Sequence, residues 1–190
     1  MSYRALIVGD RNISSEIAGL LEVEGFKGLR RARTGREALE AARAETPDVV
    51  IMEIDLPDED PVAVAREMLV MRPVPILVHA SYSQLENIRE AEENGVSAHL
   101  FRPVTKETLL AAIELGVSRF KQCQTLHAEI GNCQEALRVR KLVERAKGIL
   151  MKRNSLTEEE AFMRLQKLSR NNNITMEKVA ESIITANEII

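Results

Sequence analysis

Apolar residues in the first 120 positions gather in five short runs, separated by stretches with helical periodicity. The runs are 5–8, 28–32, 49–52, 75–80 and 98–101. Three of them are continuously apolar, which is typical of parallel strands covered on both faces. The helical stretches are 12–24, 36–45, 61–71, 83–94 and 105 onward. This alternation predicts an α/β domain with a doubly wound, five-stranded parallel sheet.

Residues 105–153 contain no proline and no strand pattern, so they predict one long helix. Its apolar positions recur three or four residues apart, at Leu109, Ile113, Val117, Phe120, Cys123, Leu126, Ile130, Cys133 and Leu137. No later segment is expected to cover this stripe. The pattern therefore favours a parallel coiled-coil homodimer over residues 105–137, with a helix folded back on its own domain as the alternative.

Residues 138–190 predict three shorter helices. Thr157 and Glu160 have the spacing of a capping box, Thr175 is a second N-cap candidate, and 171–173 reads as a turn. In the middle helix we expect Ala161, Phe162, Leu165 and Leu168 to point inward. Each helix alone is too short to be stable, so we expect a small three-helix bundle.

Composition indicates an ordinary globular protein, with 45% hydrophobic and 29% charged residues among 190. No apolar run approaches the roughly 20 residues of a membrane span, and the N-terminus lacks a signal-peptide pattern. We expect a cytoplasmic protein without membrane contact. The only cysteines, Cys123 and Cys133, suggest neither a disulfide framework nor a metal site.

Charge is divided unevenly along the chain. Residues 1–137 hold 15 Lys+Arg against 22 Asp+Glu, whereas residues 138–190 hold 11 against 7. An acidic front and a basic tail predict different partners for the two parts.

Chemistry in a doubly wound sheet gathers at the carboxyl ends of its strands. Those ends carry Gly9, Asp10, Glu53, His79 and Arg102. The motifs "LIVGD", "PDVVIMEIDLP", "ILVHAS" and "HLFRPV" resemble, in order and spacing, the response-regulator receiver family over residues 1–120. The resemblance implies two acids that hold Mg²⁺, an aspartate that accepts phosphate, a Thr or Ser, and a Lys before a proline.

Four of these five positions depart from the family pattern. Gly9 replaces the first acid, and Glu53 replaces the aspartate. His79 replaces the hydroxyl residue, and Arg102 replaces the lysine. Asp10 is retained. Acyl-phosphate chemistry needs the metal and an in-line geometry that these changes disturb. We expect a degenerate phosphorylation site closed by a Glu53–Arg102 or Asp10–Arg102 ion pair. Alternatives are Asp55 as a substitute acceptor, a residual Mg²⁺ site on Asp10 and Glu53, and a solvated Glu53 without a role.

The C-terminal segment resembles the ANTAR family (AmiR and NasR transcription antitermination regulators). The resemblance rests on Ala146-Lys147, Leu150-Met151, Glu160-Ala161, Leu165 and Ala180. It implies binding of paired stem-loops in leader transcripts. Ser169-Arg170, where the family often has Ala-Met, is a departure.

A basic helical face suits RNA, because cations attract phosphates and Arg planes can stack on unpaired bases. As the residues that contact loop bases we favour Lys147 and Arg153. For phosphate contacts the candidates are Arg145, Lys152, Arg164 and Lys167. DNA binding is less favoured, since the second and third helices begin with acids.

These patterns predict three parts: a receiver-like domain over 1–120, a coiled-coil helix over 105–137 and an ANTAR RNA-binding domain over 138–190. The leading hypothesis is a dimeric RNA-binding antiterminator controlled without phosphorylation. The alternative is a protein-interaction adaptor whose degenerate receiver docks a sensor; a sequestering protein is a further candidate partner. We expect no enzyme activity and no cofactor, since no nucleophile–base pair, glycine-rich phosphate loop or metal cluster is present.

Overall fold

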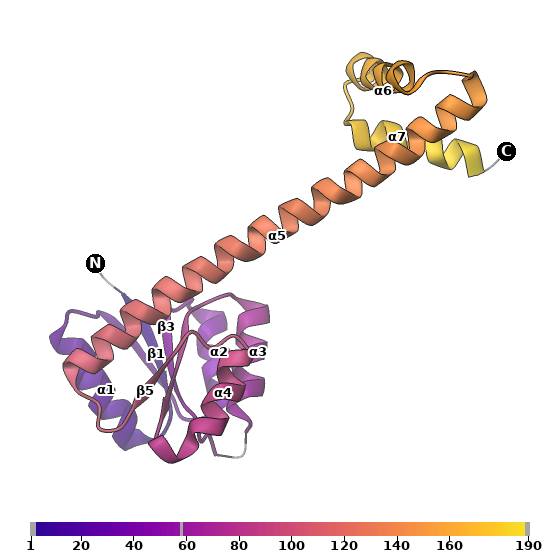
Figure 1. The fold of residues 1–190 in the computed structure, drawn as a ribbon. Helices are drawn as coiled ribbons and strands as arrows, with labels where there is room; N and C mark the ends of the chain where they lie inside the picture. Colours follow the sequence, from indigo (N-terminus) through magenta and orange to yellow (C-terminus); the bar gives the residue numbers. More distant parts are fainter. Residues whose placement is uncertain (1–2, 58, 189–190) are drawn as a thin grey trace. The chain divides into compact units, whose positions relative to one another are not determined.

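Five parallel strands form one sheet in the order β2-β1-β3-β4-β5 (Figure 1). Their bounds are β1 Arg4–Val8, β2 Gly28–Ala32, β3 Val49–Glu53, β4 Ile76–Ala80 and β5 Ala98–Phe101. The structure is a computed structural model that describes residues 3–57 and 59–188. All five predicted strands are confirmed. The edge position of β2 explains why its Arg30 and Arg31 can be exposed.

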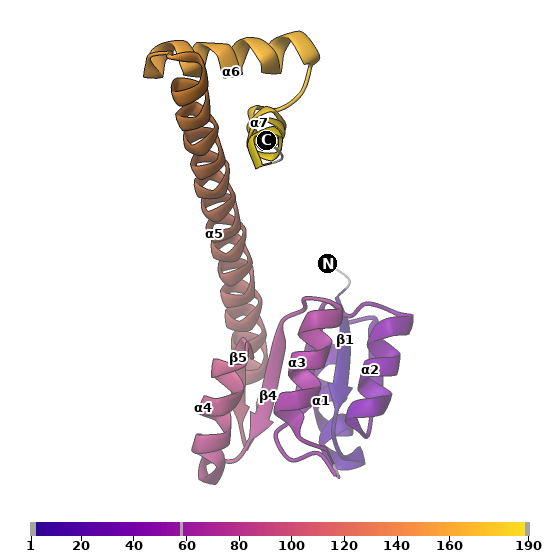
Figure 2. The same cartoon turned by 90° about the vertical axis from the view of Figure 1, so that its right-hand side faces the viewer.

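Helices cover both faces of this sheet. Helix α1 (Arg11–Val23) and the first turns of α5 (Lys106–Asn154) pack on one face through residues such as Ile17 and Leu109. Helices α2 (Gly35–Ala44), α3 (Pro61–Met71) and α4 (Leu85–Glu93) cover the other, and α2 and α3 lie side by side (Figure 2). A short 3₁₀ helix, η1 (Tyr82–Gln84), precedes α4. The doubly wound fold predicted from the sequence is confirmed.

Helix α5 is continuous over 49 residues, and every residue from 121 to 138 is exposed. Leu126, Ile130 and Leu137 are 56%, 53% and 52% exposed. These three apolar side chains therefore lie on the exposed surface of the helix. Among residues 3–57 and 59–188, no helix combines the length and apolarity needed to cross a membrane.

The chain separates into two compact units, Met1–Gln124 and Thr125–Ile190. In the second unit the end of α5 packs with α6 (Glu158–Asn172) and α7 (Met176–Glu188). Fully buried Ala146, Ala161, Leu165 and Ala180 form the centre of its core. The small residues allow close helix approach, so the three-helix bundle predicted from the sequence is present.

The caps of α6 are set by local side chains. The Thr157 hydroxyl accepts from the Glu160 N–H at 3.3 Å, and the Glu160 carboxylate accepts from the Thr157 N–H at 2.8 Å. The predicted capping box is confirmed. Residues 171–173 are not all turn, because α6 runs to Asn172 and only Asn173 takes the left-handed conformation, with φ of 51°.

Candidate functional site

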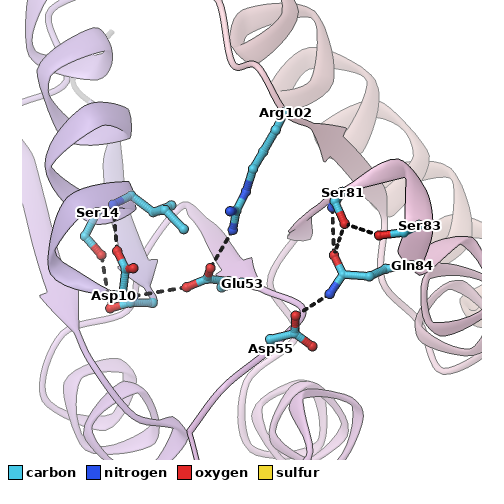
Figure 3. A network of polar contacts seen from close by, with 10 residues as sticks. Asp10, Ser14, Glu53, Asp55, Ser81, Ser83, Gln84 and Arg102 are labelled. Carbon is cyan, nitrogen blue, oxygen red and sulfur yellow. Dashed lines mark hydrogen bonds and ion pairs between the residues drawn. The ribbon is translucent and has the colours of Figure 1, made fainter.

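Glu53 ends β3 at the carboxyl edge of the sheet, where its carboxylate is held between two donors. Its Oε1 accepts from Arg102 Nη2 at 2.7 Å, and its Oε2 accepts from the Asp10 backbone N–H at 3.1 Å (Figure 3). The Glu53 side chain is 10% exposed and that of Arg102 is 51% exposed. Of the two predicted ion pairs, the structure forms Glu53–Arg102.

Asp10 follows β1 and caps the next helix. Its Oδ1 accepts from the Ile13 N–H at 2.8 Å and so caps the N-terminus of α1. An aspartate at this position satisfies a free helix N–H and favours the positive end of the helix dipole. The charge of Asp10 therefore stabilises a helix end.

Gly9 explains how the longer Glu53 fits. A Cβ built on Gly9 would lie 2.7 Å from Glu53 Oε2 and 3.1 Å from Glu53 Cβ. Any side chain at position 9 would collide with the present position of Glu53. The absence of a side chain at position 9 and the position of the Glu53 carboxylate are thus sterically linked.

His79 fills the space beside Glu53 and is paired with it in the β3–β4 register. It is 2% exposed, and neither ring nitrogen has a hydrogen-bond partner among the described residues. Burial and the nearby charge of Arg102 lower the pKa of His79 to about 4, against the opposing effect of Asp10. The imidazole is therefore neutral at pH 7 and offers no cation to a phosphoryl group.

Asp55, the alternative acceptor, belongs to a separate contact (Figure 3). Its carboxylate accepts from the Gln84 side-chain amide, and Gln84 Oε1 accepts from the Ser81 N–H at 2.7 Å. These contacts join the loop after β3 to the turn before α4. In the described ranges, no group of three or more His, Cys, Asp or Glu is placed to hold a metal ion.

Lys147, on α5, is buried rather than exposed, so the premise that it reaches a ligand freely is wrong. It is 7% exposed, and its Nζ lies 2.9 Å from Glu144 Oε1 and 2.7 Å from Glu158 Oε1. The hydrogen bond to Glu158, followed by that to Glu144, raises the pKa of Lys147. Because Glu158 begins α6, Lys147 joins the last turns of α5 to the next helix.

Four predicted RNA contacts remain exposed cations. Lys152 and Arg153 lie in the last turn of α5, and Arg164 and Lys167 lie on one side of α6. The side chains of all four lack an ion-pair or hydrogen-bond partner among residues 3–57 and 59–188. Arg145 differs, because its Nη2 donates to Glu188 Oε1 at 2.7 Å.

Two features of this surface escaped the sequence reasoning. Arg170 follows Lys167 by three residues, is exposed, and has no such partner within the described residues. Its helical spacing from Lys167 could have indicated it. Phe162 is 40% exposed, so the expectation that it points inward is wrong. Ala161 and Leu165 occupy the buried positions of α6 instead.

The sheet order, the helices on both faces and the polar residues at the carboxyl edge define a receiver fold. The family model "Response regulator receiver domain" matches residues 5–114, and the model "ANTAR domain" matches residues 132–184. The chain therefore belongs to the response regulators that join a receiver domain to an ANTAR domain.

Similar proteins agree with this membership. "Transcriptional regulatory protein PdtaR" of Mycobacterium tuberculosis is 37% identical over 182 residues, which cover 95% of this chain and 89% of the relative. A CheY-like receiver domain protein from Methanospirillum hungatei has 26% identity and a TM-score of 0.58, and the match covers 64% of this chain and 98% of that one. The receiver domain of NtrX from Brucella abortus, at 24% identity and a TM-score of 0.57 over 60% of this chain and 98% of its own, shows the fold alone.

Proposed function

We propose that this protein is a transcription antitermination regulator that binds stem-loops in leader transcripts as a cytoplasmic dimer, and that its receiver domain acts without phosphorylation. Membership in the ANTAR family and the PdtaR relative support the regulatory role. The observation that carries RNA binding is the group of exposed cations without partners in the described chain, at Lys152, Arg153, Arg164, Lys167 and Arg170.

The role proposed for each of these residues follows from its surroundings. No carboxylate of the described chain forms an ion pair with these cations, so their positive charge is available to RNA phosphates. Arg153 keeps its place as a candidate base contact, because a free guanidinium can donate to a base edge or stack on an unpaired base. For Lys147 we propose a structural role, because its ammonium group pairs with Glu144 and with Glu158 at the start of α6.

Control without phosphorylation is supported by the receiver edge. The Glu53 oxygens already accept two hydrogen bonds, and neutral His79 occupies the position where the family has a small hydroxyl. Arg102, at the position of the family's phosphate-binding lysine, is engaged by Glu53 at 2.7 Å. A signal would then reach this domain through a protein partner or a ligand rather than a phosphoryl group.

RNA captured by the full-length protein from total transcripts and then sequenced provides the hairpin for titration. Wild-type protein should prefer that hairpin to a loop-scrambled control. Arg153→Ala should reduce the preference, with a loss of about 1–3 kcal/mol if the side chain contacts a base. Lys152→Ala should weaken both RNAs equally and lower the salt slope by about one unit.

Lys178→Ala is the matched control, because Lys178 is an exposed cation of the same unit on α7, outside the proposed surface. It should leave both affinities almost unchanged. A wild-type protein that binds hairpin and scrambled RNA alike would contradict the proposal. The second candidate function, an adaptor whose receiver docks a sensor, would then take its place.

Dimerisation is proposed through the exposed apolar stripe of α5. Ile130→Asp would place two carboxylates inside the interface, at a cost of several kcal/mol. Sedimentation should then report a monomer with its receiver fold intact. Ala128→Asp, which adds the same charge on the opposite side of the helix, should remain a dimer. Equal behaviour of the two variants would place the interface elsewhere.

A further inference from the structure

Both cysteines of the chain lie on one stripe of α5. Cys123, Leu126, Ile130, Cys133 and Leu137 follow spacings of three, four, three and four residues, the a and d positions of a heptad repeat. The helix is continuous across them, and both cysteines are free and exposed. Two independent cysteines on the same exposed seam distinguish this arrangement from an isolated surface thiol.

A disulfide within one chain is excluded by helix geometry. Ten residues separate the two cysteines, which at 1.5 Å per residue is about 15 Å along the axis. Disulfides require Cα atoms within about 7 Å. Each cysteine of α5 can therefore be bridged only by a thiol from outside its own helix.

A second copy of this chain supplies that thiol in the proposed parallel dimer. Helix axes about 8–10 Å apart, less two Cα radii of about 2.3 Å, leave roughly 3–5 Å between the Cα atoms of equivalent core positions. This range overlaps the Cα separation of disulfides. Cys123 would face Cys123 of the other copy, and Cys133 its own counterpart.

The flanking residues agree with a parallel pairing. In that register Glu129 lies opposite Gln134, and Gln122 lies opposite His127, so no two acids meet. One antiparallel register, by contrast, brings the two Glu129 side chains together. Charge therefore favours the arrangement in which each cysteine meets its counterpart.

The same seam is weak without a covalent link. It has five core positions, shorter than the three to four heptads typical of a stable coiled coil, and two of the five are cysteines in place of larger apolar residues. An added covalent bond at such an interface changes the assembly more than it would in a long leucine zipper.

We propose that Cys123 and Cys133 each form a disulfide with their counterpart in a second copy of this chain when a hydroperoxide oxidises them, and that oxidation thereby stabilises the dimer. This inference rests on the proposed dimer. It adds a redox input to a regulator whose receiver edge is closed by an ion pair. Disulfides in reducing compartments are usually transient and redox-sensing, which suits such a use.

The chemistry balances with one peroxide for each disulfide. A thiolate attacks the peroxide, the O–O bond breaks, and sulfenic acid and water form. The thiol of the other copy then attacks the sulfenic sulfur, the S–S bond forms, and a second water leaves. Two thiols are oxidised, and the peroxide is reduced to two waters.

Hydrogen peroxide, added to the reduced full-length protein at low concentration, tests the proposal on a non-reducing gel. Wild type, Cys123→Ser and Cys133→Ser should each yield a covalent species of twice the monomer mass, because either remaining cysteine faces its counterpart. The double serine variant should yield none. Ala128→Cys in the double serine background is the matched control: it offers an exposed thiol away from the seam and should not link.

Sedimentation of the reduced protein separates the two levels of the proposal. A reduced dimer whose single-cysteine variants do not link would overturn the disulfides and leave the dimer standing. A monomer without links would overturn both. Linking only when both cysteines are present, with Cys123–Cys133 peptides in the digest, would show an antiparallel pair and overturn the counterpart pairing. If the proposal holds, oxidised wild type stays dimeric on dilution to concentrations at which the reduced form dissociates.

Discussion

Removal of the Arg102 guanidinium tests whether the Glu53–Arg102 pair closes the receiver edge. Arg102→Leu keeps an apolar stem and leaves the Glu53 carboxylate, 10% exposed, with the Asp10 N–H at 3.1 Å as its remaining observed donor. A buried pair that loses one partner costs about 3–5 kcal/mol, whereas an exposed pair contributes about 0–1 kcal/mol.

The Glu53–Arg102 pair lies between these limits, because the carboxylate is dehydrated while Arg102, at 51% exposed, keeps much of its water. We therefore expect Arg102→Leu to lower the free energy of unfolding by about 1–3 kcal/mol. At about 4 °C per kcal/mol, the Tm of the receiver unit should fall by roughly 4–12 °C.

A double-mutant cycle gives the sharpest form of this experiment. Glu53→Gln removes the charge but can still accept from the Asp10 N–H, so Arg102→Leu should cost less than about 0.5 kcal/mol in that background. Urea unfolding followed by circular dichroism measures all four proteins. If Arg102→Leu is equally costly in the wild type and in the Glu53→Gln background, Arg102 acts on something other than this carboxylate, and the reasoning is refuted.

Three further predictions concern the site and the bundle. Acetyl phosphate with Mg²⁺ should leave the intact mass unchanged; one added phosphoryl group mapped to Glu53 or Asp55 would contradict the closed site. Lys147→Ala should lower the Tm of the C-terminal unit by about 5 °C, while Lys147→Met, which keeps the stem, should lower it less; unchanged melting of both would return Lys147 to the binding surface. His79 binds a proton below about pH 6.5 when unfolded but only near pH 4 when folded, so its contribution to stability is lost as pH falls through this window. Across it, wild type should lose about 3 kcal/mol more than His79→Leu; parallel pH curves would show that the imidazole is not the cause.

The strands and helices could be read from the sequence because each follows from local pattern. Apolar runs identified the buried strands, and the Thr157–Glu160 spacing identified the start of α6. The Glu53–Arg102 pair was predictable as one of two options, since the carboxyl ends of the parallel strands of a sheet lie along the same edge. The choice between the options needed the structure, in which Arg102 donates to Glu53 and Asp10 accepts from the Ile13 N–H.

The two errors concern Lys147 and Phe162, whose surroundings a local sequence pattern does not determine. Lys147 looked like a surface cation, since its second carboxylate, Glu158, lies 11 residues away across the turn into α6. Phe162 is apolar and adjoins Ala161, so it was expected in the core. The buried positions of α6 are those of Ala161 and Leu165. Helical periodicity predicts which face of a helix is buried, but the prediction can be wrong by one residue. It therefore does not separate adjacent residues such as 161 and 162.

The steric link between Gly9 and Glu53 makes the effects of substitutions at these two positions depend on each other. In Gly9→Asp the new Cβ would lie 2.7 Å from Glu53 Oε2, the end of a flexible side chain that can turn away, and 3.1 Å from Glu53 Cβ, which is fixed to the backbone. Glu53→Asp shortens the side chain and removes the first of these contacts, whereas the contact with the Cβ of residue 53 stays. Gly9→Asp should therefore cost less stability when position 53 carries the shorter residue, and part of its cost should remain in both backgrounds.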